Sequence, residues 1–145
     1  MAVQTASRIS SDVLPLHPAL VIWQTGTNDL IRSGPPEAFE QALVSGIERM
    51  RRHSIDIILM DPQYFPFGEH RPSLSTYLDI IDRVAEQYQV PVLHRHQIMM
   101  YWLVSGEMPV NAMLSRDDLH MSDAAYRCIG ELLADFIVKV ALGQS

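Results

Sequence analysis

Three short runs of aliphatic residues alternate along the chain with longer segments in which apolar residues recur at helical spacing. The runs cover residues 19–25, 55–61 and 91–94. They are almost continuously apolar, as strands are when helices cover both faces of a sheet. Because strands that alternate with helices are typical of successive βα units, the pattern predicts an α/β fold with a parallel sheet.

The helical segments differ in length and in the signals at their ends. Phe39, Leu43, Ile47 and Met50 recur on one face of a helix that starts at Pro36, a residue suited to a first turn. Further helices are expected over residues 2–14, 75–89 and 96–104. A last helix should begin after Ser122, which can cap it. It is expected to bury six apolar side chains: Ile129, Leu132, Leu133, Phe136, Ile137 and Val140.

The irregular segments follow the strands, over residues 26–36 and 62–72, or precede the last helix, over residues 106–121. In an open parallel sheet, ligands bind outside the carboxyl ends of the strands. These three segments are therefore where the chemistry is expected.

Composition narrows the classes of function. The chain has 145 residues, 48% of them hydrophobic, which suits one compact domain over residues 1–145. Its formal net charge is -6, with 11 Lys and Arg against 17 Asp and Glu, so no nucleic-acid partner is expected. The apolar runs are far shorter than the roughly 20 residues of a membrane-spanning helix. A soluble chain is therefore expected. The first residues lack the pattern of a secretion signal, and the compartment is not assigned.

The first strand ends in Gly26, Thr27, Asn28 and Asp29. The Asn28 amide could donate a hydrogen bond to an oxyanion that forms during catalysis. Asn and Asp after a strand also make ordinary turns, so this motif alone leaves both interpretations open.

A second motif precedes the last helix, where Asp117 stands three residues before His120. A carboxylate that fixes the tautomer of an imidazole is the arrangement of a general base with its orienting acid. A solvated surface loop is the alternative interpretation. His94 and His96 could face one metal ion, but no third ligand stands near them in the sequence, so no metal site is expected.

Taken together, the two motifs and the Ala125-Tyr126 step on the last helix resemble the third and fifth sequence blocks of the SGNH (GDSL-type) hydrolases. The resemblance extends from Val3 to Leu142. It implies a flavodoxin-like three-layer α/β/α sandwich with strand order 2-1-3-4-5, of which the visible strands are the third to fifth. It also implies that Gly26 and Asn28 line the oxyanion hole, that His120 is the general base and that Asp117 orients it. The implied substrates are small acyl esters, such as carbohydrate O-acetyl or short-chain lipid esters, and no cofactor is required.

The sequence departs from the family in its N-terminal part, because the Gly-Asp-Ser block that carries the nucleophile and the second block are absent. Ser7, Ser10 and Ser11 fall in a helical pattern and are interpreted as helix-surface residues. We therefore expect that the nucleophile, which stays unknown, is not in this chain, and that the fold is N-terminally incomplete. The isolated chain is expected to have little or no esterase turnover. Its first strand should present an apolar edge. Either the sequence is a piece of a longer gene product or a second chain covers this edge.

Three aromatic residues follow the second strand: Tyr64, Phe65 and Phe67. They could line a substrate pocket, or they could form an ordinary cluster packed on the sheet. Two other functions remain open: a catalytically inactive remnant that binds a ligand or partner, and a flavodoxin-like binding module.

Overall fold

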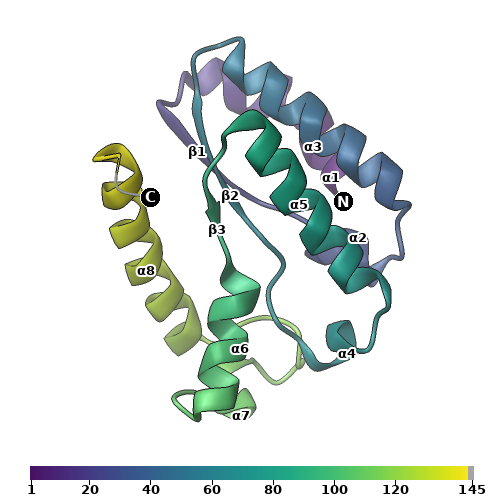
Figure 1. The fold of residues 1–145 in the computed structure, drawn as a ribbon, viewed down its shortest axis with the longest axis vertical. Coiled ribbons are helices and arrows are strands. Elements are labelled where there is room, and N and C mark those ends of the chain that lie inside the picture. The colour runs from purple at the N-terminus through teal and green to yellow at the C-terminus, as the bar shows by residue number, and fades with distance from the viewer. Residues whose placement is uncertain (144–145) are drawn as a thin grey trace. The chain divides into compact units, whose positions relative to one another are not determined.

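The computed structural model describes residues 1–143 and contains a three-stranded sheet (Figure 1). The strands are β1 (Leu20–Gln24), β2 (Asp56–Met60) and β3 (Val92–Leu93), in the order β1-β2-β3. β1 and β2 run parallel, with Leu20 opposite Asp56. Each strand lies inside one of the predicted apolar runs, so the three predicted strands are confirmed.

β1 forms an edge of this sheet in the part of the chain that the structure describes. Ala19 accepts a hydrogen bond from Asp56, and Thr25 donates one to Met60. In a parallel pair, alternate residues of a strand bond to a given neighbour. The backbone N–H and C=O groups of Leu20, Ile22 and Gln24 therefore point away from β2, toward the unpaired edge of the strand.

Helices occupy much of the rest of the described chain, and the longer ones agree with the predicted segments. The short helices α2, α4 and α7 lie in segments that were expected to be irregular. A single helical turn is too short to show helical periodicity in the sequence, so the pattern could not predict them. The bounds are α1 (Ala2–Arg8), the π-helical turn η1 (Ile9–Val13), the 3-10 turn η2 (Leu14–Leu16), α2 (Thr27–Ile31), α3 (Pro36–Arg51), α4 (Pro66–Glu69), α5 (Ser73–Tyr88), α6 (Arg95–Ser105), α7 (Val110–Met113) and α8 (Asp123–Ala141).

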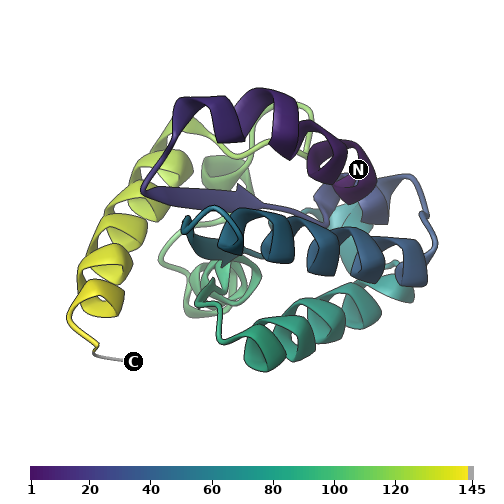
Figure 2. The ribbon, with the colours of Figure 1, turned by 90° about the horizontal axis from the view of Figure 1, so that it is seen from above.

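The chain divides into two compact units. The first unit comprises residues 1–62 and 71–92, and the second comprises residues 63–70 and the chain from Leu93 onward. In the first unit, α3 packs against both α1 and α5 (Figure 2). The expectation of a single domain stays a prediction.

The core of the first unit depends on a close approach of α3 to β1 at Gly46. A Cβ atom at this glycine would lie 2.3 Å from the Trp23 ring and 3.1 Å from the Ile9 side chain. Only glycine lets the helix pack this closely on the tryptophan. The apolar face predicted for α3 is confirmed, because its four residues are fully buried: Phe39, Leu43, Ile47 and Met50.

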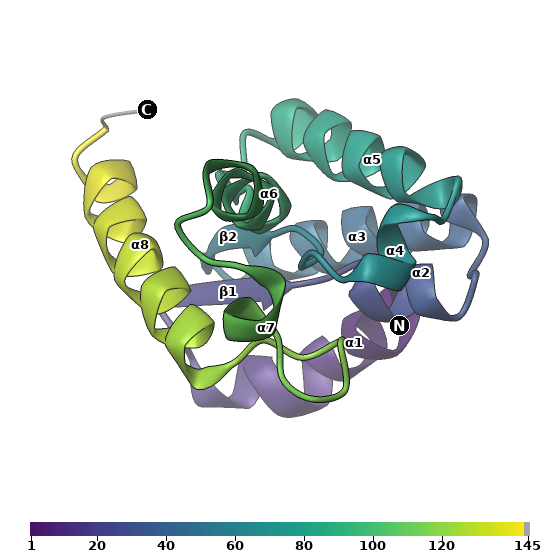
Figure 3. The same ribbon diagram turned by 90° about the horizontal axis from the view of Figure 1, so that it is seen from below.

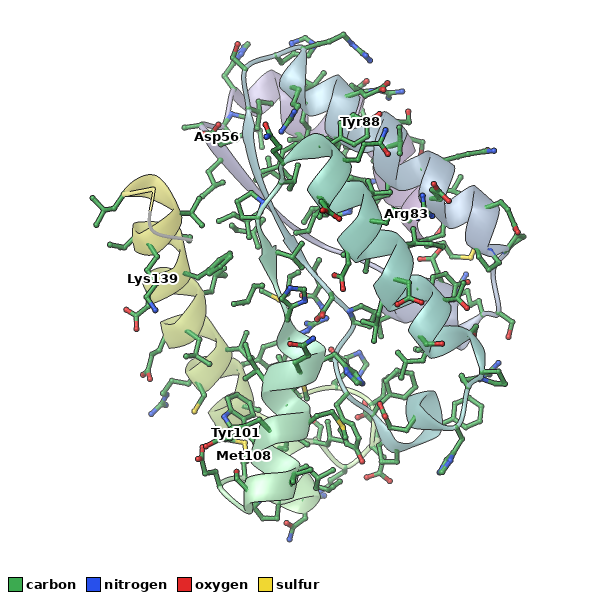
Figure 4. All side chains as sticks on the ribbon, viewed as in Figure 1. Asp56, Arg83, Tyr88, Tyr101, Met108 and Lys139 are labelled. Atoms are coloured by element: carbon green, nitrogen blue, oxygen red, sulfur yellow. The ribbon has the colours of Figure 1, made fainter. Side chains whose placement is uncertain are left out.

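Polar contacts join α3 and α5 at the surface of the first unit. Arg83 on α5 makes two hydrogen bonds to the Glu40 carboxylate, of 2.7 and 2.9 Å, and the Tyr88 hydroxyl donates to Glu48 (Figure 4). Because these groups are exposed to solvent, such pairs contribute little to stability. The apolar core therefore holds these two helices together.

In the second unit, α7 packs against α8 (Figure 3). Ser122 caps α8 as predicted, because its hydroxyl accepts a hydrogen bond from the Ala125 backbone. Leu114 and Met121 form an antiparallel bridge that closes the loop between the two helices. The loop that contains Asp117 and His120 is thus held at its base.

The prediction for the buried face of α8 is wrong in part. Ile129 is buried, but Leu132 is 39% exposed. The other four predicted core residues of this helix are half-buried: Leu133, Phe136, Ile137 and Val140. A helical period identifies an apolar stripe, but it does not reveal how far along the helix other elements cover that stripe. None of the helices within residues 1–143 combines the length and apolar character needed to cross a bilayer.

Candidate active site

Asp117 and His120 are brought together by the loop that precedes α8. The His120 Nδ1 atom lies 2.6 Å from Asp117 Oδ2. The other carboxylate oxygen, Oδ1, accepts the backbone N–H groups of Leu119, at 3.1 Å, and of His120, at 3.0 Å. A carboxylate at Nδ1 holds the proton there and leaves the Nε2 lone pair able to accept a proton. The contact between the two side chains that their spacing predicts is therefore present, and their catalytic roles stay a prediction.

These contacts change the ionisation of the carboxyl group. The side-chain bond to His120 lowers the pKa of Asp117 from 3.8 to about 2, with further lowering by the backbone N–H groups of His120 and Leu119. Each bond favours the charged form of the carboxyl group. Asp117 is therefore ionised over the whole neutral range.

The backbone of the loop is held by Ser115 and bent at Asp118. The Ser115 backbone N–H donates to the His120 carbonyl at 2.7 Å, and its hydroxyl donates to the Met121 carbonyl at 3.0 Å. Asp118 has a φ of +53°, in the left-handed region that Asp tolerates better than most residues. The His120 side chain is 64% exposed and accessible to a reacting group.

A residue that the sequence analysis missed also contacts this loop. Gln63 is buried, and its side-chain amide donates to the Leu119 carbonyl. A single glutamine carries no motif. The one available signal was its place just after β2, at the carboxyl end of a strand, where ligand-binding loops occur.

Gly26 and Asn28 lie where β1 leads into α2. Gly26 has a φ of +93°, and a Cβ atom there would lie 2.8 Å from the Pro62 ring, so the position requires glycine. Asn28 is exposed and lines a cavity of about 60 Å³ together with Gly26 and Thr27. No hydrogen bond from its side-chain amide is found within residues 1–143. The amide is thus available as a donor.

Asp29, the next residue, has a structural contact that the sequence did not reveal. Its side chain is buried, and its Oδ2 atom accepts the backbone N–H of Ala2 at 2.8 Å. This bond attaches the first turn of α1 to the loop that carries Asn28. The carboxylate of the Asn-Asp step therefore orders the cavity wall.

The two halves of the predicted site lie in different compact units. Gly26 and Asn28 belong to the first unit, and Asp117 and His120 belong to the second. The structure brings together the members of each pair. The convergence of the two pairs on one reacting atom stays a prediction.

The aromatic residues after β2 are packed to different degrees. Tyr64 is 7% exposed and Phe65 is 3% exposed, whereas Phe67 is 59% exposed. The Phe65 ring lies over Gly68, where a Cβ atom would come within 2.6 Å of it. Burial raises the pKa of the Tyr64 hydroxyl, and the nearby Glu69 charge adds to the effect. Of the three predicted substrate-binding residues, only Phe67 presents most of its ring to solvent.

Several serine hydroxyls in both units have hydrogen-bond partners of their own. Ser7, Ser10 and Ser11 are exposed on α1 and η1, as predicted for helix-surface residues. In the second unit, the Ser115 and Ser122 hydroxyls donate to the carbonyls of Met121 and Ala112. Within the described part of this unit, no hydroxyl group bonds to His120 Nε2.

His96, one member of the histidine pair singled out in the sequence, contacts a carboxylate. Its Nε2 atom lies 2.7 Å from Glu69 Oε1, and both side chains are largely shielded from solvent. This contact joins the segment of residues 63–70 to α6. Among residues 1–143, no group of three potential metal ligands gathers at one place.

Comparisons with known proteins identify relatives at the level of family and fold. A family model described as a non-GDSL lipase-like family matches residues 1–142. No curated protein sequence matches the chain. The fold is similar to that of an acetyl xylan esterase, AlAXEase, with a TM-score of 0.83 and 17% identity over 94% of this chain and 75% of that one.

Two further structures have a similar fold. A lipase/acylhydrolase from Enterococcus faecalis gives a TM-score of 0.80 with 23% identity, over 94% of this chain and 70% of that one. TesA gives a TM-score of 0.68 with 22% identity, and the alignment covers 86% of this chain. The chain spans 65% of the length of TesA. At these identities the likeness shows the fold, so the predicted α/β class of the SGNH type is confirmed.

Proposed function

The chain belongs to the non-GDSL lipase-like family, and from this premise we propose that it carries the general base and an oxyanion donor of a serine-dependent carboxylic-ester hydrolase. The observation that carries the proposal is the Asp117–His120 pair. The carboxylate is bonded at 2.6 Å to Nδ1, is ionised at neutral pH and leaves Nε2 exposed. A solvated surface loop has no need of this arrangement.

In the proposed reaction, a serine hydroxyl attacks the acyl carbonyl of the ester while His120 Nε2 accepts the hydroxyl proton. Asp117 stabilises the imidazolium that forms. The Asn28 amide and the Gly26 backbone N–H donate to the carbonyl oxygen as it becomes an oxyanion. His120 then returns its proton to the leaving alcohol, and water releases the acyl group by the same steps. No metal or organic cofactor takes part.

The proposed substrates are small acyl esters, such as carbohydrate O-acetyl or short-chain lipid esters. The names of two proteins with a similar fold, an acetyl xylan esterase and a lipase/acylhydrolase, support this class. A cavity beside Asn28, which Gly26 and Thr27 also line, could receive the acyl group next to the amide.

The proposed nucleophile comes from a strand that pairs with the open edge of β1. The peptide groups of Leu20, Ile22 and Gln24 point toward this edge, which an added strand would cover. Such a strand would end at the same edge of the sheet as the Gly26–Asn28 loop. It comes either from a longer version of the polypeptide or from a second chain.

An assay with a short-chain chromogenic ester tests the proposal. The chain of residues 1–145 is expected to show no turnover above that of its His120→Ala variant. Reading the codons that precede Met1 shows whether a strand ending in Gly-Asp-Ser is encoded. A longer product with that strand is expected to turn over, to lose at least a hundredfold in rate with His120→Ala, and to lose about 10²–10³ with Asn28→Ala.

His53→Ala is the matched control, since it removes an exposed histidine that has no place in the proposed site. Turnover by residues 1–145 that depends on His120 would refute the proposal that the nucleophile is missing from this chain. Turnover of the longer product that survives His120→Ala would refute the proposed base.

A second candidate function is a binding module without turnover. The observation that favours it is that the described serine hydroxyls of the second unit, those of Ser105, Ser115 and Ser122, donate to backbone carbonyls and not to His120. A phosphonate probe for activated serines distinguishes the two functions. Labelling of the longer product at one serine supports the hydrolase. Failure of the probe to label either the longer product or the chain of residues 1–145 supports the binding module.

A further inference from the structure

Gln63 lies where the chain leaves the β2 region and enters the segment of residues 63–70. Its side chain is only 4% exposed, and its Nε2 atom donates to the carbonyl of Leu119, 56 residues later in the chain. Both residues belong to the second unit. A buried glutamine gives up much rotamer freedom, so a well-defined partner is needed to offset that cost.

The carbonyl that Gln63 contacts is part of the peptide that leads into His120. This carbonyl and the His120 N–H belong to one planar unit. Asp117 Oδ1 accepts the N–H at 3.0 Å, and Gln63 donates to the oxygen at the opposite end. The plane is thus held from both sides. Because rotation of this plane would swing the His120 side chain, the two bonds together keep the imidazole against Asp117 Oδ2.

The two bonds also reinforce each other electronically. A donor at the carbonyl oxygen polarises the peptide and strengthens its N–H as a donor at the other end. That N–H is one of the groups that lower the pKa of Asp117. Gln63 therefore acts on the carboxylate through a single peptide group, although it does not contact the carboxylate itself.

We propose that Gln63 is a positioning residue for the His120 base, which it orients by holding the Leu119–His120 peptide in place. That His120 acts as a base rests on the proposed function. The hydrogen bonds from Gln63 to the Leu119 carbonyl and from the His120 N–H to Asp117 do not depend on it. Tyr64, Phe65 and Phe67 follow Gln63 directly in the sequence. The bond therefore also ties the aromatic segment proposed to border the substrate to the loop that carries the base.

Glu69 provides a matched control within the same segment. Its carboxylate contacts His96 on α6 at 2.7 Å, so the Glu69→Gln variant weakens a polar contact of the same segment in the same unit. In the described part of the chain, neither Glu69 nor His96 is hydrogen-bonded to the residues of the Asp117–His120 loop. A general weakening of the segment should therefore appear in this variant as well.

The test uses nuclear magnetic resonance on the folded chain and requires no turnover. In Gln63→Leu, which keeps the size of the side chain but removes the donor, the pKa of Asp117 is expected to rise from about 2 toward 3.8. The fraction of His120 with its proton on Nδ1, measured by long-range proton–nitrogen correlation near neutral pH, is expected to fall. Glu69→Gln is expected to leave both values as in the wild type. If Gln63→Leu does not fold, Gln63→Met, an unbranched side chain of similar length without a donor, is expected to change the same two quantities.

The outcomes separate the two proposals. A wild-type Asp117 pKa and a wild-type His120 tautomer in a folded Gln63 variant overturn the positioning role, whether or not the protein hydrolyses esters. Equal changes in Glu69→Gln overturn it too, because the effect would then belong to the segment as a whole. Changes confined to the Gln63 variants support the role even where His120→Ala leaves ester turnover intact, a result that defeats only the proposed function.

Discussion

The ionisation of Asp117 is decided by single hydrogen bonds. Its largest cause is the side-chain contact with His120, followed by the two backbone N–H groups. The pKa of Asp117 in the folded protein lies below 3.8, the ordinary value for an aspartate. The ionised carboxylate therefore stabilises the loop fully above about pH 4. This stabilisation is lost as the pH falls through about 2.

Titration of the Asp117 carboxyl carbon by nuclear magnetic resonance checks this assignment. The pKa is expected at about 2 in the wild type. In His120→Ala it should rise toward 3.8 without reaching it, because the two backbone N–H bonds remain. His53→Ala serves as the control and should leave the value unchanged. A wild-type value near 3.8 would show that the carboxylate and imidazole are not bonded in solution.

Sequence reasoning found the residues of the site that are close together along the chain. Asp117 and His120 are three residues apart, so one turn was enough to predict their contact. Gln63 and Leu119 are separated by 56 residues, and Asp29 and Ala2 by 27. Contacts of that range depend on how whole elements pack, which no local pattern encodes.

Among the elements, the packing of α3 on β1 leads to a prediction about two glycines. Gly46→Ala is expected to lower the free energy of unfolding by about 1–3 kcal/mol, because its Cβ would lie 2.3 Å from the Trp23 ring. No atom of the described residues lies within 4 Å of the Cβ position of Gly130 on α8. Gly130→Ala is therefore expected to raise the free energy of unfolding by about 0.5–1 kcal/mol.

Urea unfolding followed by circular dichroism measures both variants under the same conditions. The change in tryptophan fluorescence relative to the wild type provides a second signal for Gly46→Ala, since the Trp23 ring is the group displaced and the other tryptophan, Trp102, is the same in both proteins. A Gly46→Ala variant as stable as the wild type would contradict the close approach of helix and strand.

The sequence pattern predicted the elements better than it predicted their surroundings. The strands and the helices α3, α5, α6 and α8 are where periodicity and capping signals placed them. The six apolar residues predicted as the buried face of α8 share a stripe, yet only Ile129 is buried. Periodicity depends on the residues of one helix, whereas burial depends on every other element.

For the molecule as a whole, the open edge of β1 is the feature with the clearest consequence. Unpaired strand edges with apolar side chains attract other strands, and lysine on an edge strand blocks such pairing. The isolated chain is therefore expected to self-associate with rising concentration, as sedimentation velocity can measure. Ile22→Lys is expected to shift the distribution toward the monomer.

Val138→Lys is the matched control, because it adds the same charge at an exposed position of α8. It is expected to leave self-association unchanged. If Val138→Lys disperses the chain and Ile22→Lys does not, the association uses the surface of α8 and the edge of β1 is not involved.

The loop from Ser115 to Met121 contains most of what makes its carboxylate and imidazole act as a pair. Its hydrogen bonds to Asp117, and those of Ser115 to His120 and Met121, all lie within seven consecutive residues. A protein engineer could transplant this short stretch between two antiparallel residues of an unrelated scaffold. The grafted loop would bring its bonded carboxylate and imidazole with it, and the new host would have to supply a donor for the Leu119 carbonyl.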